Sequence, residues 1–202
     1  MRLYQMQDSG NCYKVRLTAH MLGLPLELVD IDILKGESRS EDFLRRNPNG
    51  RVPMVEFEDG RILAESNAIM FYLAEGTPLL PEDRFARAQA LQWMFFEQYS
   101  HEPYIAVARF WHSIKPGGRE EKKDRFPEWH ERGYQALAVM ERHLSAREWF
   151  AGDDCSIADI ALYAYTHVAH EGGFDLSPYG AIKGWMARFS AQPNHVPMDW
   201  RP

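Results

Sequence analysis

The residues best suited to chemistry fall within one stretch of the sequence, Asn47–Asn67. It holds a Val52-Pro53 bond ahead of an apolar run and a Glu65-Ser66 pair ahead of a helical run. A helix N-terminus offers unpaired N–H groups and the positive end of the helix dipole, which together favour a carboxylate. Such a cluster suits a small, charged, peptide-like ligand. The plain alternatives are a proline that begins an edge strand and an ordinary helix cap with a first-turn acid.

A second group of reactive residue types, Ser9, Asn11 and Cys12, lies where a first strand gives way to a helix. The plain alternative for Ser9 is a helix N-cap. Cys12 falls on the apolar stripe of that helix with Val15, which indicates a buried structural thiol. The other cysteine, Cys155, is distant in sequence, and the two have no metal-ligand spacing. We therefore expect no metal site.

Composition excludes several classes of protein. The chain has 202 residues, of which 45% are hydrophobic and 26% charged, as in a globular protein that can bury a sizeable core. A net charge of -6 argues against a nucleic-acid binder. No apolar run approaches the roughly 18 residues that a membrane span needs, and the N-terminus lacks the apolar region of a secretory signal. We expect a reduced, cytoplasmic protein.

The elements that position the Asn47–Asn67 stretch form a strand–helix–strand unit, a short helix, a hairpin and a last helix. The Asp59-Gly60 pair is a strong hairpin signal between two apolar runs. This order is typical of a small mixed four-stranded sheet with helices on it, the thioredoxin-like arrangement. The predicted elements are strands around Leu3–Met6, Leu28–Ile33, Val52–Phe57 and Ile62–Ala64, and helices around Cys12–Leu22, Glu41–Arg46 and Ile69–Leu73.

The second half of the chain has helical periodicity and no convincing strand pattern. We predict an α/β domain over residues 1–76, a linker over 77–84 and an all-α bundle over 85–202. The bundle is predicted to begin with a long helix over Arg84–Trp111 that Pro103 kinks or divides, followed by a loop over Lys115–Asp124. A helical stripe from Trp129 to Leu144 comes next, and then a capping box, Ser156–Asp159, before a buried helix Ile160–Val168. Ser177-Pro178 is predicted to start a last helix that Pro193 closes.

A thioredoxin-like domain joined to a helical domain resembles the cytosolic glutathione S-transferases. The resemblance covers nearly the whole chain, with four motifs in register. Val52-Pro53 is similar to the family's Val-Pro pair, and Glu65-Ser66 is similar to its Glu-Ser pair. Ser156–Asp159 is similar to the capping box of the family's helical domain. Ser9–Arg16 is similar to the first-helix signature of bacterial members close to the Ser-type, theta- or zeta-like classes.

The resemblance implies a binding site for glutathione as co-substrate. In the family the Val-Pro bond is cis, which would leave the backbone of Val52, next to Pro53, free to pair with the ligand like an added strand. Ser66 would donate to the γ-glutamyl carboxylate, and Glu65 would accept from its ammonium group. Lys35 would contact the glycyl carboxylate, although a solvated lysine is equally compatible with its loop position.

The resemblance also implies how the thiol is activated, and here alternatives stay open. A hydroxyl at Ser9 would hydrogen-bond the glutathione sulfur and favour the thiolate, with the amide of Asn11 as second candidate. The expected activity is a glutathione transferase of detoxification, a homodimer that adds the thiolate to a hydrophobic electrophile. One alternative is a glutathione-dependent disulfide or peroxide reductase that uses Asn11 or Cys12, and another is a non-catalytic binding module.

Overall fold

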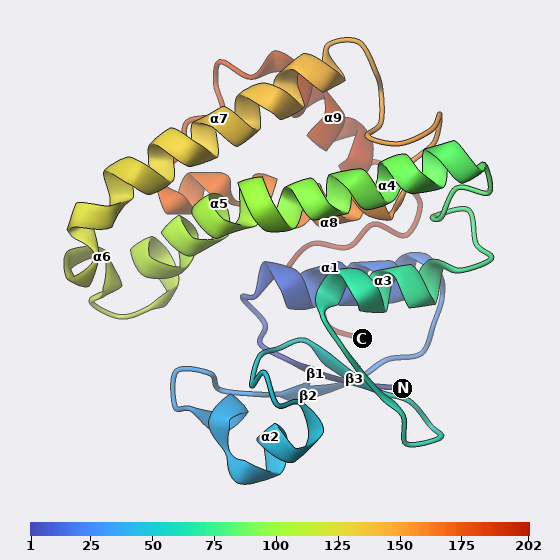
Figure 1. Ribbon diagram of the computed structural model, residues 1–202, viewed down its shortest axis with the longest axis vertical. Helices are drawn as coiled ribbons and strands as arrows, with labels where there is room; N and C mark the ends of the chain where they lie inside the picture. Colours follow the sequence, from blue (N-terminus) through green and yellow to red (C-terminus); the bar gives the residue numbers. More distant parts are fainter. The chain divides into compact units, whose positions relative to one another are not determined.

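The computed structural model describes residues 1–202, which form two compact units (Figure 1). The first unit comprises Met1–Thr77 together with Pro193–Pro202, and the second comprises Pro78–Gln192. The C-terminal segment thus packs with the N-terminal half of the chain. No helix in either unit has the length and apolar character needed to cross a membrane.

The first unit is a mixed four-stranded sheet with the strand order β2-β1-β3-β4. β1 pairs with β2 in parallel and with β3 antiparallel, and β3 pairs with β4 antiparallel. This is the predicted thioredoxin-like topology. Its elements are β1 Arg2–Gln5, α1 Gly10–Met21, β2 Glu27–Asp30, the 3-10 turn η1 Glu37–Arg39, α2 Glu41–Arg46, β3 Met54–Glu56, β4 Ile62–Ala64 and α3 Ser66–Ala74.

Helices cover both faces of this sheet, with α1 and α3 on one face and α2 on the other (Figure 1). Successive residues of a strand point to opposite faces. One core therefore contains Leu3, Val15, Val55 and Ile69. The other contains Tyr4, Phe43 and Met54. Because both faces are covered, the short strands are apolar without a clean polar alternation.

Two predicted strands are longer than the observed ones, because side chains and turns end the ladders early. β2 stops at Asp30, and Oδ1 of Asp32 then accepts the N–H groups of Leu34 and Lys35, which turns the chain. β3 begins only at Met54, after the proline. The predicted bounds of α2 and β4 agree with the structure.

The second unit contains only helices and turns, as predicted. They are α4 Arg84–Phe96, the π-helical turn η2 Glu97–His101, α5 Glu102–Arg109, the π-helical turn η3 Phe110–Ile114, α6 Gly118–Glu121, the 3-10 turn η4 Lys123–Arg125, α7 Phe126–Leu144, α8 Ile157–Thr166, the 3-10 turn η5 Ala169–Gly172 and α9 Gly180–Ser190.

Pro103 divides the predicted long helix in the expected place. It lies in the first turn of α5, where its missing N–H costs nothing, and the π-helical turn Glu97–His101 precedes it. Further along, every residue of α8 is buried, and the capping box Ser156–Asp159 that starts this helix is formed in both directions. The buried core helix was therefore predicted correctly, although it begins at Ile157 and ends at Thr166.

Two predictions for this unit were wrong. The expected loop Lys115–Asp124 contains the short helix α6. Gly117, in the left-handed αL conformation, turns the chain into the four residues of this helix. Ser177-Pro178 does not start α9, because the Asp175 carboxylate accepts the Ser177 N–H and Oγ–H in a turn. α9 begins at Gly180.

The first turn of α9 is capped from another helix. The two carboxylate oxygens of Glu141, on α7, accept the N–H groups of Ala181 and Ile182 at 2.8 and 2.9 Å. A helix start that a remote side chain caps has no signal in its own sequence.

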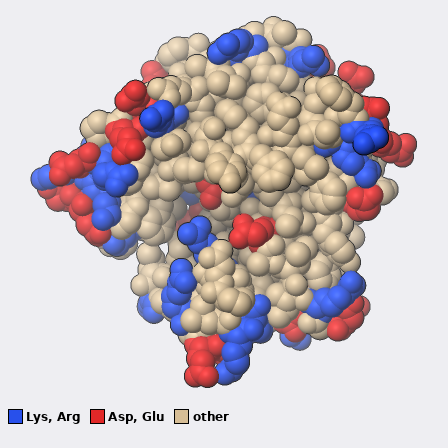
Figure 2. Space-filling model, viewed as in Figure 1, with Lys and Arg blue, Asp and Glu red and all other residues tan.

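On the face of the molecule in Figure 2, basic and acidic side chains are interspersed.

Candidate functional site

The sheet topology brings the predicted site residues to one end of the first unit. β1 and β4 both end where β3 begins, because Met54 pairs with Tyr4 on one side and with Ala64 on the other. The loop that carries Ser9 leaves β1 at this end, the Val52-Pro53 pair enters β3 here, and Glu65-Ser66 follows β4. We call this set of residues the candidate site.

The Val52–Pro53 peptide bond is cis, in agreement with the resemblance. Pro53 is buried, whereas Val52 is half-buried and lies beyond Met54, the last paired residue of β3. The N–H and C=O groups of Val52 are therefore left out of the ladder, where an extended ligand backbone could pair with them. The preceding turn is held by Asn47, whose Nδ2 donates to the Arg51 carbonyl at 2.8 Å.

Glu65 and Ser66 mark the start of α3. Its N-cap residue, Glu65, makes no side-chain capping hydrogen bond, and the start of a nine-residue helix favours an anion. Ser66 is buried and Glu65 is exposed, with Oε1 accepting from Asn49 Nδ2 at 3.3 Å. Glu65 has a φ of 70°, a conformation that costs a non-glycine residue about 1–2 kcal/mol. Such strain is found most often at functional sites.

Ser9 is the N-cap of α1. Its Oγ accepts the N–H of Cys12 at 3.3 Å. A hydroxyl that accepts one hydrogen bond keeps its own proton to donate. The N-cap role and a thiol-binding role are therefore compatible in the same side chain.

Asn11 is joined directly to Ser66, 55 residues away in sequence, and to a lysine. Its Oδ1 accepts from Ser66 Oγ at 3.0 Å and from Lys14 Nζ at 2.8 Å. Lys14 is fully buried and Asn11 half-buried. The two halves of the candidate site, the α1 end and the α3 end, thus meet at one amide oxygen.

Cys12 and Lys35 have plainer surroundings. Cys12 is fully buried, and its Sγ accepts the Met6 N–H at 3.4 Å. Burial raises the pKa of the Cys12 thiol and outweighs the hydrogen bonds from Ser9 and Met6, so the thiolate is disfavoured. The Lys35 side chain is 79% exposed and pairs with Asp32 at 3.0 Å. It follows β2, which runs parallel to β1, so Lys35 lies toward the same end of the sheet.

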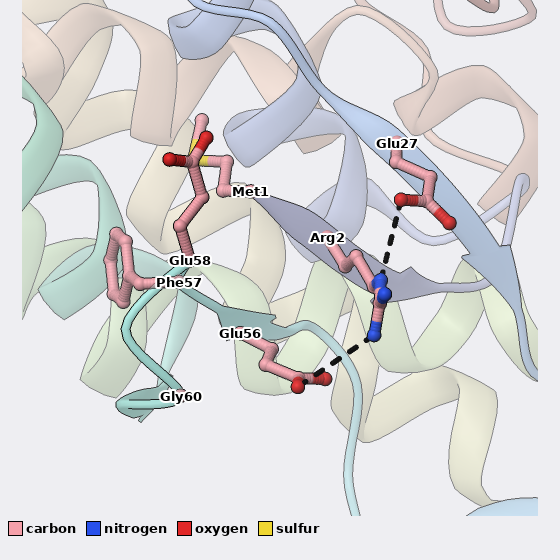
Figure 3. Close-up of a pocket in the computed structure, with 7 residues that line it drawn as sticks. All are labelled: Met1, Arg2, Glu27, Glu56, Phe57, Glu58 and Gly60. Atoms are coloured by element: carbon pink, nitrogen blue, oxygen red, sulfur yellow. Dashed lines mark hydrogen bonds and ion pairs between the residues drawn. The ribbon is translucent and has the colours of Figure 1, made fainter.

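A separate hollow of about 270 Å³ lies at the opposite end of the strands (Figure 3). Arg2, the first residue of β1, sits there between Glu27 and Glu56, at 3.3 and 3.7 Å from their carboxylate oxygens. None of the predicted site residues lines this hollow.

No group of three or more His, Cys, Asp or Glu side chains is arranged to hold a metal ion. The candidate site instead offers a free strand edge, an uncapped helix start and hydroxyl and amide donors near the start of a second helix. These groups suit a ligand with a peptide backbone, a carboxylate and a weakly acidic group such as a thiol.

Sequence reasoning missed Lys14. Its position three residues after Asn11 places both side chains on one face of a helix, which is the signal that could have found it. A lysine on a helix is usually solvated, however, so its burial was not expected.

The sequence matches two protein families, the glutathione S-transferase N-terminal domain over residues 1–75 and the glutathione S-transferase C-terminal domain over residues 90–193. The structure is similar to a possible glutathione S-transferase from Rhodopseudomonas palustris, with 53% identity and a TM-score of 0.97 over 100% of this chain and 90% of that one.

Two further relatives differ in their described properties. The disulfide-bond oxidoreductase YfcG of Escherichia coli (strain K12) is 30% identical over 91% of this chain and 87% of its own length. The glutathione transferase URE2P8 of Phanerochaete chrysosporium, solved with oxidized glutathione, is 25% identical, with a TM-score of 0.83 over 96% of this chain and 90% of that one.

Proposed function

The chain belongs to the glutathione S-transferase family, and from this premise we propose that it binds glutathione at the candidate site and activates the thiol for attack on a hydrophobic electrophile. The observation that carries the proposal is the convergence of three separate segments at one end of the sheet, with Ser66 Oγ bonded to Asn11 Oδ1. URE2P8 was solved with oxidized glutathione, and the same ligand chemistry suits the groups gathered here.

Each part of the tripeptide has a partner in this proposal. The cysteinyl backbone pairs with the N–H and C=O of Val52, beside the cis Pro53. The γ-glutamyl carboxylate takes the uncapped N–H groups of α3 and the Ser66 hydroxyl, while the exposed Glu65 carboxylate accepts from the ammonium group. Lys35 reaches the glycyl carboxylate from its exposed loop.

The thiol lies at the start of α1, where Ser9 and Asn11 supply donors. A thiol of pKa about 8.5 is mostly protonated at neutral pH, and only the thiolate is a good nucleophile. Hydrogen bonds from the Ser9 hydroxyl and the Asn11 amide, with the dipole of α1, favour the thiolate. The thiolate sulfur then forms a bond to the electrophilic carbon, and the leaving group departs with the electron pair.

Isothermal titration with glutathione, followed by conjugation assays with a panel of electrophiles, tests the proposal. We expect binding that Ser66→Ala weakens by roughly 10- to 150-fold, because a hydrogen bond to a charged group contributes about 1.5–3 kcal/mol. Ser177→Ala, in a turn of the second unit, is the matched control. Absence of any binding at millimolar glutathione would refute the site assignment and leave a non-catalytic module.

A disulfide reductase is the second candidate, because YfcG is a disulfide-bond oxidoreductase. In that reaction the glutathione thiolate attacks one sulfur of a disulfide, and the other sulfur leaves as a thiolate. The buried Cys12, with its raised pKa, is a poor participant, so the reaction would use Asn11 and Ser9 as the transferase does. Assays with a mixed disulfide and with electrophiles in parallel separate the two activities.

The proposal includes a cytoplasmic homodimer with a role in detoxification. Large apolar side chains are left exposed along α4 and η2, with exposed fractions of 72% for Phe85, 63% for Phe95 and 79% for Tyr99. Exposed apolar surface of this kind is typical of a subunit interface. Sedimentation velocity should give a dimer that Phe95→Glu dissociates.

A further inference from the structure

We propose that Lys14 is a positioning residue for thiol activation, holding the Asn11 amide so that its N–H₂ group is directed at the glutathione sulfur. This inference rests on the proposed function and goes beyond it by adding a buried cation to the thiol site. The observation that carries it is the contact of Lys14 Nζ with Asn11 Oδ1 at 2.8 Å, made by a lysine with no exposed surface.

The contact fixes which way the Asn11 amide faces. An ammonium group has only donors, so the amide atom that meets Lys14 Nζ must be the oxygen. The Ser66 hydroxyl donates to the same atom. The oxygen and the nitrogen of a planar amide diverge. With Oδ1 held on the side of Lys14 and Ser66, Nδ2 is directed to the opposite side of the amide group.

Ser66 alone could not hold this orientation once ligand is bound. Its hydroxyl has one proton, which in the free protein goes to Asn11 Oδ1 at 3.0 Å. A bound γ-glutamyl carboxylate is a stronger, charged acceptor for the same proton. When the Ser66 hydroxyl turns to the ligand, Lys14 is the residue that keeps Asn11 in place. The ammonium also polarises the amide and strengthens its N–H groups as donors, since hydrogen bonds in a chain reinforce one another.

The orientation distinguishes Asn11 from Ser9. The Ser9 hydroxyl is hydrogen-bonded to Cys12 in the free protein and must rotate about its C–O bond to donate to a ligand. The Asn11 amide has a fixed direction that needs no reorganisation when the thiolate forms. We therefore assign the larger share of thiolate stabilisation to Asn11, and Lys14 acts through it.

The test measures the pKa of the bound thiol, from the ultraviolet absorbance of the thiolate, in Lys14→Met, Asn11→Ala and the double variant. We expect Lys14→Met to raise this pKa and to lower kcat/KM for conjugation about tenfold at neutral pH, while the Kd for S-methylglutathione stays within about twofold. The double variant should be no worse than Asn11→Ala, because residues that act as a unit are non-additive. Lys183→Met, on the exposed face of α9, is the control.

A second variant covers a loss of folding in Lys14→Met. Asn11→Asp keeps acceptors for Lys14 and Ser66 but has no N–H to donate, so we expect a folded protein with an impaired thiol. The inference is overturned if Lys14→Met or Asn11→Asp leaves the thiol pKa unchanged, or if the losses in the double variant multiply. Failure of the wild-type protein to bind glutathione would instead refute the proposed function.

Discussion

Burial and hydrogen bonding have opposite effects on the pKa of Asp159, the buried acid of the capping box, and one substitution can separate them. Its Oδ1 accepts the N–H of Phe150 at 3.2 Å and Nε1–H of Trp185 at 2.9 Å. Its Oδ2 accepts the N–H and the Oγ–H of Ser156 at 2.9 and 3.0 Å. Burial raises the pKa of Asp159 to about 6, although these hydrogen bonds lower it.

The substitution to use is Asp159→Asn. Its amide can keep the oxygen toward Phe150 and Trp185, but its N–H₂ group then faces the Ser156 N–H, which loses its acceptor. One buried donor without a partner costs about 1–3 kcal/mol. Asp159→Ala would leave three fixed N–H donors without an acceptor, or roughly 3–9 kcal/mol in simple addition. That is comparable with the whole stability of a domain, about 5–15 kcal/mol, so the alanine variant is expected to unfold.

The pH dependence gives the sharper result. Because the folded pKa is raised, the folded state binds a proton that the unfolded state has already released between pH 3.8 and about 6. The stability that Asp159 contributes is present below the lower value and is lost as pH rises through the upper one. The difference in pKa corresponds to roughly 3 kcal/mol. The cost of Asp159→Asn should therefore fall by most of that amount, about 2 kcal/mol, between pH 4 and pH 7.

Urea unfolding of both proteins across this pH range is the measurement, with Asp154→Asn as a control for an exposed acid in the same loop. The difference between wild type and Asp159→Asn cancels the titration of all other groups. If the cost of the substitution grows with pH instead, the four hydrogen bonds outweigh burial and the pKa of Asp159 lies below its ordinary value. That result would refute the reasoning.

Three further predictions follow from single contacts. Glu65→Gly should raise the free energy of unfolding by about 1 kcal/mol, since glycine accepts the φ of 70°, while calorimetry shows weaker glutathione binding than in the wild type. Gly133→Ala should lower the free energy of unfolding by about 1–3 kcal/mol in urea titrations, because its Cβ would lie 2.4 Å from the Phe174 ring. Arg16→Met removes donors to the carbonyls of Gln7 and Met198, at 2.9 and 2.7 Å, so Pro193–Pro202 should become sensitive to carboxypeptidase.

Local patterns were sufficient for most of the fold. The stripe of α7, the capping box of α8 and the hairpin between β3 and β4 are short-range signals, and the structure has all three. Features that depend on distant partners were not predictable. The start of α9 is capped by Glu141 from another helix, and the Ser177-Pro178 pair, a good local start signal, belongs to a turn.

The C-terminal segment illustrates the same limit. Pro193–Pro202 has no periodicity, yet it packs with the first unit through Arg16, which is fully buried. The Arg16 Nη2 joins the Gln7 and Met198 carbonyls, and Arg201 pairs with Asp30 at 2.8 Å. A buried arginine on a helix gives no sign in the sequence of which segment it holds.

The candidate site was predictable to the extent that topology alone determines it. In the observed strand order the ends of β1 and β4 meet the start of β3, so a thioredoxin-like arrangement makes Ser9, the Val52-Pro53 pair and the Glu65-Ser66 pair neighbours. The roles of individual side chains at this end of the sheet depend on contacts over a few ångströms. The spacing of residues in the sequence does not specify these contacts.

The choice between Ser9 and Asn11 shows why those contacts matter. The resemblance to the family's Ser-type classes ranks Ser9 first, because a hydroxyl at this position in those classes hydrogen-bonds the glutathione sulfur. In the structure Ser9 Oγ already accepts the Cys12 N–H, at 3.3 Å, and the Ser9 side chain also hydrogen-bonds the Cys12 thiol. Asn11 is held through its oxygen by Ser66 and Lys14. Because stabilisation of a developing charge depends on donors oriented beforehand, the held amide is the better candidate. A buried lysine that looks like ordinary helix surface in the sequence therefore changes the expected order of the two residues.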